Sequence, residues 1–344
     1  MDVQKILTDA AAKVGPSGQE MEVAEYFAEQ FRPFVDEVTV DSMFNVIAHK
    51  KGTGPKVALF AHMDEIGLMV VAIEEDGSLR LGNVGGVDPR ILPACRVWVH
   101  GKEKLFGTIG ALPPHLMKAE DQKQNYRRED LYVDVGLPAE KVRELVRVGD
   151  IVTFNVPSTP LLNGQFAAKT MDDRACVTML VETAERLRKL QCDADVYFVG
   201  STQEEVGSRG AKTAAYALDP DLAIAIDVDH ATIPGSRPNT TVDLDSLCAS
   251  IGPFLQPKLL KRLIDCAAAH HVKLQTTVAE RNTYTDGDDV ALARAGVPVV
   301  LLSLPLKYMH TTVETLDIQA LKEGSRLLSH FLSELDAEWE DDLW

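Results

Sequence analysis

The chain has 344 residues, 45% of them hydrophobic and 25% charged, which is enough for one or two domains with a substantial buried core. Its 35 basic and 52 acidic residues give a formal net charge of -17, which argues against nucleic acid or a membrane surface as a partner, because phosphate groups would be repelled. No apolar run approaches the roughly 18 residues that a membrane span requires. The five scattered cysteines include no CxxC pair and indicate buried thiols in a reducing, cytoplasmic compartment.

The first elements along the chain are two helices and three strands. Apolar residues recur at helical spacing over 3–13 and 20–31, and strand-like stretches follow at 37–40 and 45–50. Residues 56–61, with the sequence KVALFA, are apolar throughout, as expected for a strand that is covered on both faces.

The predicted secondary-structure pattern changes between residues 68 and 162. Short β-rich pieces are separated there by Gly, Pro and Asp turns, a pattern that is typical of a small all-β barrel or sandwich. After residue 162, strands again alternate with helices, which predicts a mixed sheet with helices on both faces. The strands are expected at 194–201, 222–226 and 297–304, and the helices at 172–190, 210–217, 257–270, 288–295 and 317–335.

These two patterns predict two domains. We expect an α/β domain made of residues 1–67 and 163–344, interrupted by an all-β, barrel-like domain at 68–162. The sequence shows no internal repeat. The acidic segment 336–344 is expected to fray.

Polar side chains gather at the ends of the predicted elements. Taken singly, each has an ordinary explanation: a histidine after a strand is more often a hydrogen-bonded polar residue than a ligand, and an aspartate that opens a helix can be an N-cap. In an open α/β sheet, however, ligands bind beyond the carboxyl ends of the strands, so these side chains are expected to converge. They are His62, Asp172, Glu204, Glu205, Asp227 and His310.

The residue types in this set point to metal binding. Two imidazoles with three carboxylates suit zinc, cobalt or manganese better than magnesium, which prefers oxygen ligands throughout. Five ligands exceed one tetrahedral site, so one carboxylate would bridge two divalent ions about 3.5–4 Å apart. The expected ligands are His62, Asp172, Glu205, Asp227 and His310.

The neighbouring acids Glu204 and Glu205 are predicted to have separate roles. Two glutamates in a narrow cleft repel each other, and a metal beside one of them relieves that repulsion. We interpret Glu205 as the ligand and Glu204 as the general base that takes a proton from the attacking water, with a solvated acidic turn as the alternative. Asp64, two residues after His62, is expected to accept the second imidazole N–H and fix the ring.

Five segments spread across the chain resemble one known family and occur in that family's order. They are AHMDEIGLMV, KTMDDRA, STQEEVGSRGA, AIDVDHATIPG and SLPLKYMHTTVE. The family is that of the cytosolic dinuclear aminopeptidases that form tetrahedral particles, a group that includes glutamyl and deblocking aminopeptidases.

The resemblance implies a phosphorylase/hydrolase-like metallopeptidase core and two zinc or cobalt ions. It implies that Asp172 bridges the metals, that Glu204 is the base, and that the bond between Asp172 and Asp173 is a cis peptide. It also implies that the inserted β domain serves homo-oligomer contacts, in assemblies from a dimer to a tetrahedral dodecamer. Two positions depart from the family pattern: Asp229 stands where a small residue such as threonine is usual, and Tyr284 stands where glycine is usual. His115 fits a family pattern without an assigned role.

These observations predict a metal-dependent aminopeptidase that acts on peptides. One alternative is an amidohydrolase of the same chemistry that acts on N-acyl amino acids, and another is a non-catalytic, peptide-binding assembly protein. A glycosidase would need two carboxylates about 5 Å or more apart on either side of a sugar bond, which adjacent glutamates provide poorly. The preferred N-terminal residue, the native metal and the size of the assembly are left open by the sequence.

Overall fold

The computed structural model describes residues 1–237, 240–335 and 339, and the chain forms two compact units. The first unit contains Met1–Asp64, Ser158–Met309 and Val313–Trp344, and the second contains Glu65–Pro157 and His310–Thr312. These limits lie a few residues before the domain boundaries expected from the sequence pattern. Most of the acidic segment 336–344 lies outside the described residues.

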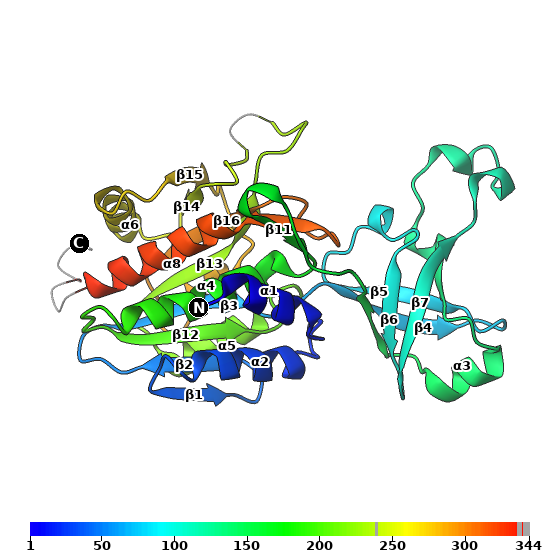
Figure 1. Ribbon diagram of the computed structural model, residues 1–344, viewed down its shortest axis with the longest axis horizontal. Coiled ribbons are helices and arrows are strands. Elements are labelled where there is room, and N and C mark those ends of the chain that lie inside the picture. The colour runs from blue at the N-terminus through cyan, green and yellow to red at the C-terminus, as the bar shows by residue number, and fades with distance from the viewer. Residues whose placement is uncertain (238–239, 336–338, 340–344) are drawn as a thin grey trace. The chain divides into compact units, whose positions relative to one another are not determined.

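A mixed sheet forms the centre of the first unit (Figure 1). Among the described residues it has eight strands in the order β1-β2-β12-β3-β13-β16-β14-β15. Strands β12, β3, β13 and β16 run parallel to one another, whereas β2 and β14 pair antiparallel to their neighbours β12 and β16. The strands are β1 (Glu37–Val40), β2 (Val46–Lys50), β3 (Lys56–His62), β12 (Asp195–Ser201), β13 (Leu222–His230), β14 (Leu247–Ile251), β15 (Leu274–Val278) and β16 (Val299–Leu306).

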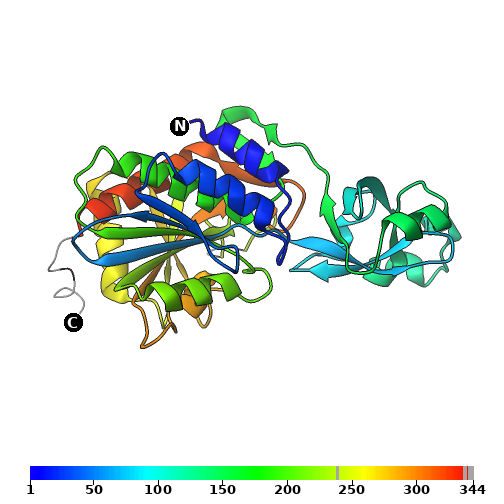
Figure 2. The same cartoon turned by 90° about the horizontal axis from the view of Figure 1, so that it is seen from below.

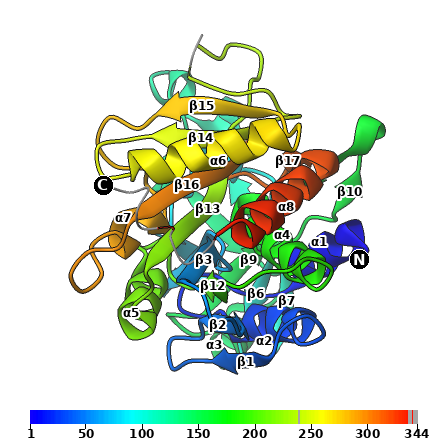
Figure 3. The same cartoon turned by 90° about the vertical axis from the view of Figure 1, so that its left-hand side faces the viewer.

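Helices cover both faces of this sheet because its central strands are apolar on both sides (Figures 2 and 3). In β3, Leu59 packs into the larger core on one face and the adjacent Phe60 packs into the smaller core on the other. The larger core contains residues of α1 (Val3–Ala12), α2 (Met21–Phe31), α4 (Met171–Leu187), α6 (Pro257–Ala269) and α8 (Ile318–Ser333). The smaller core contains residues of α5 (Arg209–Leu218) and α7 (Asp286–Val290).

Several short strands were not expected from the sequence. Strands β14 and β15 extend the main sheet, and a separate three-stranded sheet is formed by β10 (Thr159–Pro160), β11 (Gln165–Ala168) and β17 (Glu314–Asp317). Each of these strands is five residues or shorter, and β15 alternates only between intermediate and exposed positions. Such segments carry too little hydrophobic periodicity to be recognised without their partners.

The second unit is a closed antiparallel barrel of six strands within the described residues, in the order β4-β5-β8-β7-β6-β9. Its interior is filled by alternate residues such as Leu68, Val70, Val97 and Val99, all of them buried. The elements are β4 (Gly67–Ile73), β5 (Leu79–Val84), β6 (Arg96–His100), β7 (Lys104–Ala111), β8 (Leu131–Asp134), β9 (Ile151–Phe154) and the unpredicted helix α3 (Ala139–Leu145).

Short 3₁₀ turns complete the secondary structure, at Pro89–Ile91, Pro114–Leu116, Asp121–Lys123, Arg128–Asp130 and Leu162–Gly164. The predicted fold class is confirmed: the chain combines a mixed α/β sheet, with helices on both faces, and an inserted all-β barrel. Among the described residues, the structure contains no helix that is both long and apolar enough to span a membrane.

Candidate metal centre

Buried and half-buried ligand-type side chains gather in the first unit, around the last residue of β3. The ligand-type atoms of His62, Asp172 and Glu205 lie within 4.8 Å of one another, and so do those of His62, Asp173 and Asp227. His62 belongs to both groups. The side chains meet because the parallel strands β3, β12 and β13 end at one edge, where α4 begins. Four of the five predicted metal ligands are therefore brought together.

The ring of His62 is held from both of its nitrogens. Its Nε2 lies 3.1 Å from Oδ1 of Asp172, and its Nδ1 lies 3.2 Å from the backbone carbonyl oxygen of Asp64. The carboxylate of Asp64, which the sequence suggested as the partner of this nitrogen, is further away, at 3.5 Å. The backbone N–H of His62 also donates to Oδ2 of Asp173 at 3.2 Å. Asp173 is thus part of the site, although no separate role was predicted for it.

Asp172 does not act as an ordinary helix N-cap. Asp172 and Asp173 have non-helical backbone dihedrals, and the peptide bond between them is cis, as the family resemblance implied. The N–H of Asp172 donates to Oε2 of Glu314 at 3.1 Å, which ties the start of α4 to β17. These contacts direct the Asp172 carboxylate toward His62 and away from the capping position.

Two buried acids fix the backbone that carries Glu204 and Glu205. Asp64 accepts the N–H of Glu204 through Oδ1 at 3.0 Å and that of Glu205 through Oδ2 at 3.3 Å. Glu20, at the start of α2, accepts the N–H of Gln203 at 3.2 Å through its Oε1. Three consecutive amides therefore bind carboxylates that are fully buried. The same Glu20 oxygen accepts the N–H of Gly18 at 2.7 Å, and the sequence marked Glu20 only as the beginning of a helix.

The carboxylates of the site carry more negative charge than the neighbouring cationic groups and hydrogen-bond donors balance. Burial, with a further contribution from Asp227, raises the pKa of Glu204 to about 9, although the nearby His62 opposes this shift. Burial also raises the pKa of Asp173 and of Asp227 well above the usual range. Burial alone would lower the pKa of His62, but its hydrogen bonds to Asp172 and Asp64 raise it instead.

Buried carboxylates of this kind need protons or a cation to balance them. Within the described part of the chain, Oδ1 of Asp173 and Oδ1 of Asp286 are buried without a hydrogen-bond partner. An imidazole surrounded by several carboxylates is a donor set that suits a divalent transition metal. The residues present therefore fit the metal ions that the sequence predicted.

His310 groups with the second unit, as part of the segment His310–Thr312. Its Nδ1 lies 3.0 Å from the carbonyl oxygen of Gly86. A carbonyl partner at Nδ1 sets the proton on that nitrogen and leaves Nε2 as the basic one, the arrangement that is usual for a metal-binding histidine. The metal-binding role of His310 stays a prediction.

Asp229, Tyr284 and His115, to which no role was assigned from the sequence, lie in three different environments. Asp227 lies inside β13, which runs on to His230, so Asp229 belongs to the same strand and does not follow it. Tyr284 is 82% exposed and has a φ of 57°, a conformation that favours glycine, which accounts for the glycine that is usual at this position. Asp286 is buried and bonds to the hydroxyl of Ser201. His115 lies on an exposed 3₁₀ turn in the second unit.

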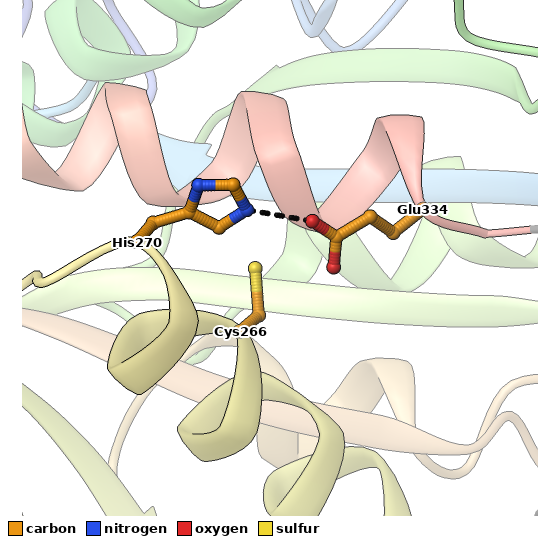
Figure 4. A group of neighbouring side chains, drawn as sticks. All are labelled: Cys266, His270 and Glu334. Atoms are coloured by element: carbon orange, nitrogen blue, oxygen red, sulfur yellow. Dashed lines mark hydrogen bonds and ion pairs between the residues drawn. The ribbon is translucent and has the colours of Figure 1, made fainter.

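A third group of ligand-type side chains lies on the covering helices and not at the strand ends (Figure 4). Cys266 and His270 are one turn apart at the end of α6, and Glu334 follows α8. His270 already bonds to Glu334 at 2.7 Å, and its ring stacks on that of His330 with the centroids 3.6 Å apart. These contacts account for His270 and Glu334 as a hydrogen-bonded pair between neighbouring helices.

Comparisons with known proteins show which sequences and folds this chain resembles. The model of the M42 glutamyl aminopeptidase family matches residues 45–327. The lysyl aminopeptidase of Pyrococcus furiosus is 37% identical over 327 residues, which cover 93% of this chain and 94% of that protein. A TET aminopeptidase from a marine sediment archaeon of the Thaumarchaeota superposes with a TM-score of 0.95, at 29% identity and 99% coverage of both chains. The TET1 peptidase of Pyrococcus horikoshii, which can assemble into a tetrahedron or a large octahedral shell, gives 0.84 at 30% identity and covers 97% of this chain and 100% of that one.

The anchoring of the loop by Glu20 can be tested through stability. Replacing Glu20 with alanine removes the buried acceptor of the N–H groups of Gly18 and Gln203, and each lost hydrogen bond costs about 0.5–1.5 kcal/mol. We expect Glu20→Ala to lower the thermal midpoint clearly, whereas Glu20→Gln keeps an acceptor oxygen and most of the stability. Glu25→Ala, at an exposed site of the same helix, is the control and should change stability by no more than about 0.5 kcal/mol. A wild-type melting curve for Glu20→Ala would contradict the anchoring role.

Proposed function

Because the chain belongs to the M42 glutamyl aminopeptidase family and is a metal-dependent aminopeptidase, we propose how its clustered side chains divide the reaction among them. The enzyme is a hydrolase that releases N-terminal amino acids from peptides. The observation that carries the assignment is that the ligand-type atoms of His62, Asp172 and Glu205, and those of His62, Asp173 and Asp227, lie within 4.8 Å of one another, with the carboxylate of Glu204 beside them. This many ligand-type side chains exceed what a single tetrahedral ion needs.

In this proposal two divalent metal ions, zinc or cobalt by preference and manganese as a further option, would be held by five side chains, Asp172 among them. When bound, the ions supply Lewis-acid polarisation of the scissile carbonyl and a cationic anchor for the free α-amine. Asp173 lies in the group of Asp227, but it also accepts the backbone N–H of His62, so we assign it a supporting role. The proposed ligands are His62, Asp172, Glu205, Asp227 and His310.

Glu204 is the proposed general base. Its Oε2 lies 4.0 Å from Nε2 of His62, beside the ligand groups, and its backbone N–H is held by Asp64. From this place the carboxylate can take a proton from the attacking water and pass it to the amine of the leaving peptide. Asp64 orients both His62 and the backbone of Glu204, so it acts on the reaction through these neighbours.

The proposal also covers the oligomeric state of the chain and its cellular compartment. Since the TET1 peptidase of Pyrococcus horikoshii assembles into closed shells, we propose that this chain is a homo-oligomer, from a dimer to a tetrahedral dodecamer. The barrel unit, with exposed apolar residues such as Phe106 and Leu116, is the proposed contact region. A cytoplasmic location is supported by the five cysteines, all of which are free.

The division of roles between the adjacent glutamates predicts opposite outcomes for two matched variants. Glu204→Gln should keep the metal content and lower kcat by roughly 10²–10⁴-fold, the usual contribution of general acid–base catalysis. Glu205→Gln should lose bound metal, and activity with it. Metal content by mass spectrometry and kcat on an aminoacyl-anilide measure both. A Glu204→Gln enzyme that turns over at the wild-type rate would show that the base is another group.

Metal removal separates the aminopeptidase from its two rivals. Chelation should abolish hydrolysis of a free-amine leucyl-anilide and lower the thermal midpoint, because the ions bind only the folded state. Adding back zinc, cobalt or manganese should restore both. The N-acetylated anilide should stay intact throughout. Faster cleavage of the acetylated substrate would favour an N-acyl amidohydrolase, and protein that binds neither metal nor substrate would favour a non-catalytic assembly protein.

The size of the particle tests the oligomer. Native mass spectrometry of the purified chain should give a multiple of the 37.7 kDa subunit, between two and about twelve copies in keeping with closed symmetry. Replacing Phe106 and Leu116 together with serine should shift the distribution toward smaller species without changing the fold. A wild-type chain that stays monomeric at micromolar concentration would rule the oligomer out.

A further inference from the structure

A cavity of about 740 Å³ opens over four strands of the main sheet in the first unit. Asp229 of β13, Ser303 of β16, Ser250 of β14 and Thr277 of β15 line it. The segment 279–285, which leads into α7, supplies another wall. The volume falls within the range of about 300–1,000 Å³ that is typical of small-molecule sites.

The cavity lies next to the candidate metal centre in both sequence and sheet register. Val228 and Asp229 directly follow Asp227, and the cavity residue Ser303 is the register partner of Asp227 on the neighbouring strand. Asp227 and Asp229 lie two residues apart in one strand, so their side chains point to the same face, about 7 Å apart along the strand. A substrate residue whose carbonyl group lies at the candidate metal centre can therefore extend its side chain toward Asp229.

The charged residues that line the cavity are all acidic. Its lining contains two acids, Asp229 and Glu280, and includes no lysine, arginine or histidine among the described residues. Neither acid forms an ion pair in the described part of the chain. Oδ1 of Asp229 accepts the N–H of His230 at 2.6 Å, and Oδ2 lies 3.5 Å from the hydroxyl of Thr277.

These surroundings distinguish between classes of side chain. An apolar side chain would displace water from Asp229 without replacing its hydrogen bonds, and an acidic side chain would be repelled. The rest of the wall is largely threonine, serine and amide groups, which can accept hydrogen bonds from a cation. A lysine side chain presents a long methylene stem and three donors at its end, and arginine presents a fork of donors.

We propose that this cavity receives the side chain of the substrate's N-terminal residue and selects lysine or arginine there, through Asp229 in the wall and Glu280 at the exposed rim. The proposal rests on the proposed function, because it takes the neighbouring cluster as the place of hydrolysis. It gives Asp229, the residue that departs from the family pattern, a specific role. It also implies that N-terminal glutamate is a poor substrate for this chain.

Four aminoacyl-anilides test the proposal on the metal-loaded wild-type enzyme: those of lysine, arginine, norleucine and glutamate. Norleucine matches the stem of lysine but lacks the ammonium group, so their ratio isolates the charge. We expect kcat/KM for lysine to exceed that for norleucine by roughly tenfold or more, as a half-buried charge pair provides. Arginine should behave like lysine, and glutamate should be the poorest of the four. Equal values for lysine and norleucine would overturn the proposal.

Variants locate the source of any preference. Asp229→Asn should bring the lysine-to-norleucine ratio close to one, and Glu280→Lys, at the rim, should lower it even if Asp229→Asn folds poorly. Asp265→Asn makes the same change in net charge at an exposed site of α6 and should keep the wild-type ratio. An unchanged ratio in a folded Asp229→Asn enzyme and in Glu280→Lys would overturn the cavity assignment. If no anilide is hydrolysed after metal loading, the proposed function fails as well, a result distinct from hydrolysis without preference.

Discussion

Three buried carboxylates, those of Asp172, Asp173 and Asp227, lie around the buried ring of His62, with the half-buried Glu204 beside them. Removing several carboxylates from water is strongly unfavourable unless protons, hydrogen bonds or a cation compensate them. The protein provides part of that compensation through main-chain donors and the ring of His62. The remaining excess of negative charge supports the proposal that divalent ions bind at this site.

A second layer of acids keeps the first one in place. Asp64 and Glu20 contact the backbone of residues 203–205 and leave the side chains of Glu204 and Glu205 to face the cluster. Glu314 does the same for the start of α4. Although burial opposes it, hydrogen bonds from His62, Ser17 and the amide of Glu204 lower the pKa of Asp64, whereas burial raises the pKa of Glu20 to about 7. The chemistry therefore depends on residues that would not contact the substrate.

The sheet order connects hydrolysis to selectivity. Strand β13 carries Asp227 in the cluster and Asp229 in the adjoining cavity, on the same face of the sheet. Strand β16 lies beside it and contributes Ser303 to the cavity wall. Because both functions share rigid strands, the reacting carbonyl and the side-chain cavity keep a fixed spacing. Substitutions at position 229 can then change the preferred substrate without rebuilding the site.

The sequence by itself determined the α/β class, the inserted barrel and most of the residues that gather at the strand ends. These follow from local signals: apolar strands such as 56–61 end at a polar residue, and parallel strands end at one edge. Only the tertiary structure decided the contacts made between distant segments. The roles of Glu20 and Asp173 and the strands β14 and β15 all depend on partners far away in the chain. Hydrophobic periodicity records which side of an element is buried, but it does not record which residue lies opposite.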